Sequence, residues 1–267
     1  MHQSLRLLFI TALSMLILPR FAAAMDLQPH RAVYRMVLAN VARNSDIAFA
    51  SGLMAYRFAR SCDGWTVENR TLLQLLYQDD TEVDSLWSFV SWESLDGRRF
   101  RFHARYDQDG RTVEKFDGDA DLDASGGSGR VRFWDGKDPI VLPKGTVFPT
   151  AHVRELLEAA AAGRSRLDRT VFDGASPDNP YQVNARFGPL PSDVAAGIGK
   201  TFGLAPLPGW WTQMAFFPTN GQETLPDFEM GAWYRADGIA DNIVQQFDTF
   251  SLDVRLKQLE LLPAPDC

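Results

Sequence analysis

An alternation of apolar and polar residues with a period of two constrains this chain more than any other feature. Its clearest stretch spans residues 99–106, where Phe100, Phe102, Ala104 and Tyr106 alternate with three arginines and a histidine. A period of two places alternate side chains on opposite faces, so this stretch predicts a half-buried antiparallel strand. Weaker versions of the pattern predict strands at residues 32–38, 51–58, 66–77, 82–92, 130–134, 181–187, 212–217, 228–235, 242–247 and 251–259.

Asp-Gly pairs separate many of these stretches. Both residues tolerate positive φ, which tight connections between antiparallel strands require. The pairs stand at residues 63–64, 96–97, 109–110, 117–118, 135–136 and 237–238. The sequence therefore predicts a mainly β protein, built as a meander of hairpins.

One segment has a helical period instead. Val153, Leu156, Leu157 and Ala160 recur at about 3.6 residues within 150–163, which predicts one short amphipathic helix packed on or inside the sheet. We expect Thr150 to cap its N-terminus and Gly163 to end it. Residues 188–209 are rich in proline and glycine and are predicted to form a long irregular excursion, with a helical turn near residues 193–196.

The first residues have the three-part order of a secretory signal peptide. A short basic stretch ends at Arg6, an apolar segment covers residues 7–18, and Ala22 and Ala24 suit cleavage before Met25. The apolar segment is well below the roughly 20 residues that a membrane-spanning helix needs. We therefore expect residues 1–24 to be removed, residues 25–267 to form a single domain, and no integral membrane segment to remain.

The charge balance argues against two classes of partner. Without residues 1–24, the chain carries 25 basic and 34 acidic residues, a net charge of −9. Such a surface has no electrostatic attraction to nucleic acid or to an anionic bilayer. We therefore expect no nucleic-acid partner.

The chain contains two cysteines, Cys62 and Cys267. An even count in an exported protein favours a disulfide between them, and this bond would tie down the last residue of the chain. Two separate buried thiols are the alternative. A redox-active pair is disfavoured because the two do not form a C-x-x-C motif.

Two motifs resemble binding sites but lack a required residue. Residues 199–201 (Gly-Lys-Thr) look like the end of a phosphate-binding P-loop, yet Val194 stands where the first glycine belongs. The alternating carboxylates Asp117, Asp119, Asp121 and Asp123 lack the glycine of a calcium-binding loop. We interpret them as a solvated acidic strand edge.

Titratable residues give no catalytic or metal-binding pattern. The histidines after residue 24 are His30, His103 and His152, which are far apart and have no zinc-ligand spacing. Carboxylates such as Glu93, Asp96 and Glu229 could form a hydrolytic pair only if the fold brought them together across a cleft. We therefore expect no catalytic residues, no metal and no cofactor, and a protein that is not an enzyme.

The aromatic content is more suggestive. A strongly curved sheet could line a concavity with these rings, but we favour the simpler interpretation of a large aromatic core. The residues in question are Trp87, Phe89, Trp92, Phe100, Phe102, Phe133, Trp134, Trp210, Trp211, Phe216 and Phe217.

Taken in order, several stretches resemble one known family. They cover nearly the whole chain after residue 24, at residues 30–34, 62–65, 92–100, 142–152, 172–174, 215–218 and 226–229 and at the final Cys267. The chain is similar to the EipB family (envelope integrity protein B) of periplasmic proteins from alphaproteobacteria. Residues 188–209 match the family least well.

The resemblance implies both a fold and a role. It implies a monomeric antiparallel β-spiral, meaning a sheet wound into an open, barrel-like coil, with a disulfide between Cys62 and Cys267. It also implies a soluble periplasmic protein that maintains the cell envelope and has no established catalytic activity. No active-site residue can be transferred from the family.

Three functional hypotheses follow. The leading one is a periplasmic protein that supports envelope integrity by binding a partner protein or an envelope component. An alternative is a carrier of a lipid or a lipidated protein in the concave face of the sheet. The least favoured is a hydrolase acting on an envelope polymer.

Overall fold

The computed structural model describes residues 26–176, 179–219 and 224–267, so the predicted signal peptide at 1–24 lies outside the described residues. In the described part of the chain, a single 15-stranded sheet has the order β8-β7-β6-β5-β4-β3-β2-β1-β15-β14-β13-β12-β11-β10-β9. The strands are β1 (His30–Val41), β2 (Ile47–Arg60), β3 (Gly64–Tyr77), β4 (Glu82–Ser94), β5 (Arg99–Gln108), β6 (Arg111–Leu122), β7 (Gly129–Phe133), β8 (Ile140–Leu142), β9 (Thr146–Val147), β10 (Arg166–Val171), β11 (Tyr181–Pro189), β12 (Gly209–Pro218), β13 (Phe228–Arg235), β14 (Ala240–Gln246) and β15 (Phe250–Leu261).

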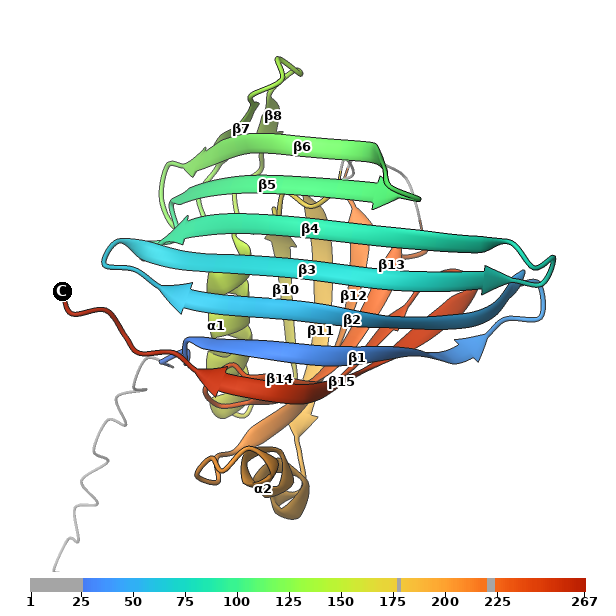
Figure 1. The fold of residues 1–267 in the computed structure, drawn as a ribbon. Helices are drawn as coiled ribbons and strands as arrows, with labels where there is room; N and C mark the ends of the chain where they lie inside the picture. The colour runs from blue at the N-terminus through green and yellow to red at the C-terminus, as the bar shows by residue number, and fades with distance from the viewer. Residues whose placement is uncertain (1–25, 177–178, 220–223) are drawn as a thin grey trace, which may run out of the picture.

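The sheet curls into a nearly closed, barrel-like wall (Figure 1). The first and last strands, β1 and β15, pair with each other, and the chain winds away from this pair in both directions. The two edge strands, β8 and β9, follow each other in the sequence. Neighbouring strands are antiparallel, apart from the parallel pair β9 and β10. The predicted mainly β, spiral-like antiparallel fold is confirmed.

Strand β5 shows how the alternating pattern specifies the fold. Phe100, Phe102 and Ala104 are buried, whereas the intervening arginines and His103 are exposed. The next strand contains the Asp117-Gly118 pair, where the predicted turn is wrong. Gly118 lies opposite Phe102, and a Cβ atom on it would approach the Phe102 ring to 2.7 Å. The glycine therefore makes room for a core side chain instead of making a turn.

The predicted acidic strand edge is also wrong. Strand β6 pairs with β5 on one side and with β7 on the other, so its aspartates do not lie at an edge. Arg132 forms ion pairs with Asp119 and Asp121, and Asp117 is paired with His103 and Lys115. Asp117, Asp119 and Asp121 thus neutralise basic side chains on the outer face of the sheet.

Helix α1 (Pro149–Ala161) is the predicted amphipathic helix. It buries Leu156 and Leu157 in the main core and crosses the space enclosed by the sheet (Figure 1). Gly163 follows it with a φ of 76°, as expected for a residue that ends a helix. The predicted cap is wrong, because Phe148 holds the N-cap position and Thr150 lies inside the helix.

A second helix, α2 (Ser192–Thr201), corrects the prediction of a largely irregular segment at 188–209. Ala195 and Ile198 are buried on one of its sides, which explains why ten residues become helical despite two internal glycines. Within the described residues, neither helix has the length and apolar character needed to cross a membrane.

The sulfur atoms of Cys62 and Cys267 form a disulfide between the β2–β3 connection and the last residue. Their Cα atoms are 5.7 Å apart and 205 residues separate them in sequence. The bond fixes the C-terminal tail, which continues past β15 (Figure 1).

Two apolar clusters fill the interior. The main cluster includes α1 and residues from both halves of the sheet. The second, here called the phenylalanine core, comprises Phe100, Phe102, Ala104, Phe116, Ala120, Leu122, Val131, Leu142, Phe148 and Phe172.

Candidate functional site

A cavity of about 250 Å³ lies within the main cluster. Strands β1–β4 form one wall, β13 and β14 form another, and the first turn of α1 borders a third side. We call it the tyrosine-lined cavity. Its lining residues are Leu27, His30, Tyr34, Met54, Tyr56, Phe58, Val67, Asn69, Phe89, Ser91, Pro149, Thr150, Val153, Met230, Tyr234, Gly238, Ala240, Ile243 and Gln245. The lining is largely apolar and includes no Asp, Glu, Lys or Arg.

Three of the polar side chains that line the cavity are tyrosines. The hydroxyl of Tyr34 donates a hydrogen bond to the Ala240 carbonyl, with an O···O distance of 2.9 Å. Among the described residues, the hydroxyls of Tyr56 and Tyr234 have no hydrogen-bond partner and are not enclosed by protein. Two donors therefore face open space inside the barrel.

The tyrosines stay protonated at neutral pH. Burial raises the pKa of Tyr234 to about 12. Burial also raises the pKa values of Tyr34 and Tyr56, and a charge on Tyr234 would raise both further. A charge on one tyrosine can raise the pKa of another only if their hydroxyls lie near one another. The cavity thus holds a cluster of neutral hydroxyl groups.

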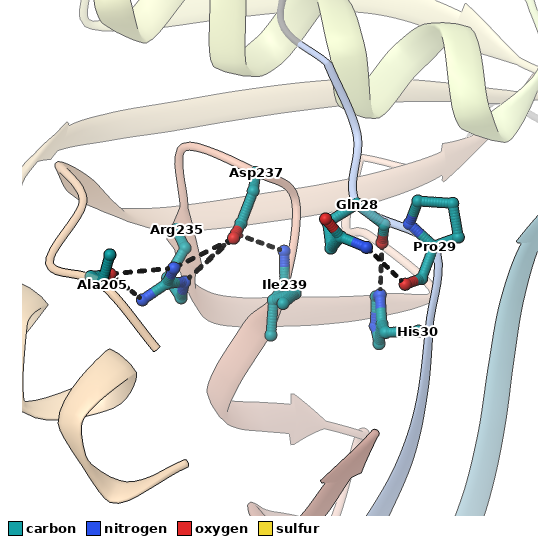
Figure 2. A network of polar contacts seen from close by, with 7 residues as sticks. All are labelled: Gln28, Pro29, His30, Ala205, Arg235, Asp237 and Ile239. Atoms are coloured by element: carbon teal, nitrogen blue, oxygen red, sulfur yellow. Dashed lines mark hydrogen bonds and ion pairs between the residues drawn. The ribbon is translucent and has the colours of Figure 1, made fainter. Parts of the chain in front are cut away.

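A polar network lies beside the cavity and includes its lining residue His30 (Figure 2). The buried Arg235 side chain forms an ion pair with Asp237 at 3.0 Å and donates to the Ala205 carbonyl. Asp237 also accepts a hydrogen bond from the Ile239 amide. These contacts hold the β13–β14 turn, whose Gly238 lines the cavity, against the segment that follows α2.

His30 belongs to the same network and is neutral. Its Nδ1 lies 2.7 Å from the Gln28 carbonyl oxygen, which can only accept, so Nδ1 carries the proton (Figure 2). Burial lowers the pKa of His30, although the Gln28 contact and the nearby Asp237 act in the opposite direction. The imidazole therefore adds no charge to the cavity at neutral pH.

Glu93 positions the first turn of α1 beside the cavity. Its two carboxylate oxygens accept hydrogen bonds from the Thr150 and Ala151 amides, at 2.7 and 2.9 Å. These amides belong to the unpaired donors of a helix N-terminus, and they lack a cap from the Phe148 side chain. Burial raises the pKa of Glu93 to about 7, while the amide hydrogen bonds pull it down.

The three carboxylates singled out in the sequence do not form a catalytic pair. Glu93 is committed to the α1 N-terminus, and Asp96 accepts a bond from Ser94 in the β4–β5 turn. Glu229 precedes Met230, which lines the cavity, so the alternation of the strand directs Glu229 to the opposite face. There it accepts a hydrogen bond from Gln213.

The histidines are equally dispersed. His30 lines the cavity, His103 pairs with Asp117 on the outer face, and His152 is buried in α1. Burial lowers the pKa of His152 to about 4, and its Nε2 has no partner in the described part of the chain. In the ranges that the structure describes, no three His, Cys, Asp or Glu residues are grouped to hold a metal ion.

The aromatic residues singled out in the sequence mostly lie elsewhere. Of that set, Phe89 lines the cavity, Phe100 and Phe102 fill the phenylalanine core, and Trp134 is 62% exposed. The sequence did not single out the three tyrosines. They lie in the strands predicted at 32–38, 51–58 and 228–235, and this position was the available signal.

The fold and the cavity together define a class: a barrel-like, mainly antiparallel sheet around one helix, with a largely apolar pocket that no charged side chain lines. The chain belongs to the EipB-like family, whose model matches residues 21–263. The family expected from the sequence is therefore confirmed.

A similar sequence and a similar solved structure are both known from Brucella abortus. The cell envelope integrity protein EipB of Brucella abortus (strain 2308) is 27% identical over 246 residues, which cover 90% of this chain and 86% of the relative. A crystal structure of a beta-barrel-like protein from Brucella abortus, described as a domain of unknown function, matches with a TM-score of 0.80 and 25% identity. That match covers 90% of this chain and 100% of the other.

Proposed function

We propose that this chain is a periplasmic protein that supports cell-envelope integrity by binding an envelope component or a partner protein, without catalysing a reaction. The name of the Brucella relative supports the envelope role. Export through residues 1–24 and a monomeric state are parts of the same proposal.

The tyrosine-lined cavity carries the binding part of this proposal. Protein interiors are normally packed with few voids larger than a water molecule. Here the interior keeps about 250 Å³ open in a wall of apolar side chains. An apolar space with a few convergent polar groups is the usual form of a small-molecule site.

The charges around the cavity favour binding over turnover. The titratable groups that line it are neutral tyrosines and a neutral histidine. The buried carboxyl group of Glu93, whose partner Thr150 lines the cavity, has both oxygens engaged by helix amides. Glu93 is therefore not free to act as a general acid or base.

A carrier of a lipid or a lipidated protein is the second candidate, and the apolar lining favours it. The volume limits what is carried, because an engineered cavity of about 150 Å³ holds a benzene-sized ligand. The cavity could therefore take one end of an acyl chain and not a whole diacyl lipid. Mass spectrometry of organic extracts from the purified protein tests this: a reproducible bound lipid supports the carrier, and its absence opposes it.

A complementation experiment tests the envelope role. We expect a strain lacking this protein to admit a normally excluded dye, and the wild-type gene to restore the barrier. The variant Val67→Phe, which places a larger ring in the cavity, should restore it poorly. Val90→Phe on the exposed face of β4 is the matched control. Full rescue by Val67→Phe, at equal protein level in the periplasmic fraction, would contradict a role for the cavity.

A further inference from the structure

The open hydroxyls of Tyr56 and Tyr234 are the least explained feature of the interior. A buried hydroxyl normally finds a hydrogen-bond partner, as that of Tyr34 does at the Ala240 carbonyl. Tyr56 and Tyr234 come from strands on opposite walls and converge on the same space. A ligand with a hydrogen-bond acceptor would give these two hydroxyls the partner that they lack.

The surroundings restrict the charge of that ligand. No side chain of opposite charge lines the cavity to pair with a carboxylate or a phosphate. The Glu93 carboxyl group lies directly behind the cavity residue Thr150, where it repels anions when ionised. Burying an unpaired anion is costly, so the polar end of the ligand should be neutral.

The remaining walls restrict the rest of the ligand. Met54, Phe58, Met230 and Ile243 present apolar surface to the same space. Scaled from a benzene-sized ligand in about 150 Å³, the volume admits on the order of ten non-hydrogen atoms. This is the size of a short alkyl chain with one polar group.

We propose that the tyrosine-lined cavity binds a neutral acyl group, with its chain against the methionines and its carbonyl oxygen accepting hydrogen bonds from Tyr56 and Tyr234. The inference rests on the proposed function, because it assumes that the cavity is the binding site. The acyl group can belong to an ester, as in a lipid, or to an amide, as in an acylated amine.

Methionine methyl groups give a local readout. Met54 and Met230 line the cavity, whereas Met36 and Met214 are buried away from its walls. We expect methyl octanoate and N-methyloctanamide to shift the NMR signals of the first two in a saturable way and to leave the second two unchanged. Octanoate at pH 7 should bind at least tenfold more weakly. Tighter binding of the ester or of the amide indicates the source of the acyl group.

Tyrosine variants test the hydrogen bonds. Tyr56→Phe combined with Tyr234→Phe should weaken ester binding about tenfold. Tyr77→Phe is the control and should leave binding unchanged, because Tyr77 does not line the cavity. Unchanged Met36 and Met214 signals verify the fold. If the double variant does not fold, the preference of the wild type for the ester over octanoate still tests whether the ligand is a neutral acyl group.

Benzene separates two kinds of failure. Octanoate binding as tightly as the ester, or full affinity in the folded double variant, would overturn the proposed ligand. If benzene still shifts Met54 and Met230, the cavity remains a binding site and the proposed function stands. If neither benzene nor the ester shifts them, the cavity is not a binding site and both proposals fail.

Discussion

The two apolar clusters inside this sheet differ in how completely they are filled. In the phenylalanine core, Phe100 packs on Phe148 with ring centroids 5.0 Å apart, and Phe172 meets Phe102 edge-on at 5.5 Å. Gly118 and Gly174 lie so close to Phe102 that a Cβ on either would clash with its ring. The tyrosine-lined cavity instead keeps about 250 Å³ open.

The difference indicates that the phenylalanine core stabilises the fold, whereas the tyrosine-lined cavity is available for binding. Dispersion contacts and burial make a filled aromatic cluster strongly stabilising, whereas a cavity forgoes those contacts. Helix α1 lies between the two, because its cap residue Phe148 belongs to the phenylalanine core and Thr150 lines the cavity. The contrast predicts that substitutions on the two sides will have different costs.

The largest expected effect is in the phenylalanine core. Phe100→Ala should lower the free energy of unfolding by about 3–5 kcal/mol, because the ring is fully buried and its neighbours cannot collapse into the space. Phe58→Ala is the matched control, since that ring is also buried but borders the open volume, and it should cost less. Denaturant unfolding measures both. Equal losses would show that the cavity wall is as tightly packed as the core.

The disulfide gives the next largest effect. Cys62→Ser should lower the free energy of unfolding by roughly 2–4 kcal/mol, because the bond closes a long loop and restricts the unfolded chain. The bond ties the tail to the connection between β2 and β3, two strands of the cavity wall. Thermal unfolding with and without reductant measures the loss in the wild type. A variant as stable as the oxidised wild type would contradict a stabilising role.

Much of the fold could be predicted because its signals are local. The alternation at 99–106 identified β5 and its inward face, and the 3.6-residue period identified α1. The failures depended on distant partners. Gly118 looked like part of a turn until strand pairing placed it opposite Phe102, and the α1 amides are capped by Glu93, 57 residues earlier in the chain.

The candidate site was harder to predict for the same reason. Tyr34, Tyr56 and Tyr234 converge because β1 pairs with β15, across nearly the full length of the sequence. No local pattern distinguishes these tyrosines from other inward-facing aromatic residues such as Phe100. The sequence therefore indicated an aromatic interior without indicating which rings would leave space open.

A smaller effect is expected at Glu93, at the boundary of the two regions. Its pKa of about 7 in the folded protein exceeds the usual 4.5. The unfolded chain therefore releases the proton more easily, and the free energy of unfolding falls as the pH rises from about 4.5 to 7, by up to about 3 kcal/mol. Glu93→Gln should remove this dependence while costing about 1–2 kcal/mol at pH 4.5, because one helix amide loses its acceptor.

The measurement is the free energy of unfolding of both proteins across this pH range. Burial of His152 produces the opposite dependence between its folded pKa of about 4 and 6.5, and it is present in both proteins, so their difference isolates Glu93. A difference that does not change with pH would mean that Glu93 has the same pKa in the folded and unfolded states.

The smallest effect on stability should come from the tyrosines, and it sharpens the contrast within the cavity itself. Tyr34→Phe leaves the Ala240 carbonyl without its donor, so it should cost about 1–2 kcal/mol. Tyr56→Phe and Tyr234→Phe remove hydroxyls that have no protein partner among the described residues and should each change the free energy of unfolding by less than about 0.5 kcal/mol. Denaturant unfolding of the three variants gives the order. A hydroxyl that contributes little to folding and faces an interior space is available to a ligand. A large loss in the free energy of unfolding at Tyr56 or Tyr234 would instead mean that these hydroxyls stabilise the fold and are not free to bind.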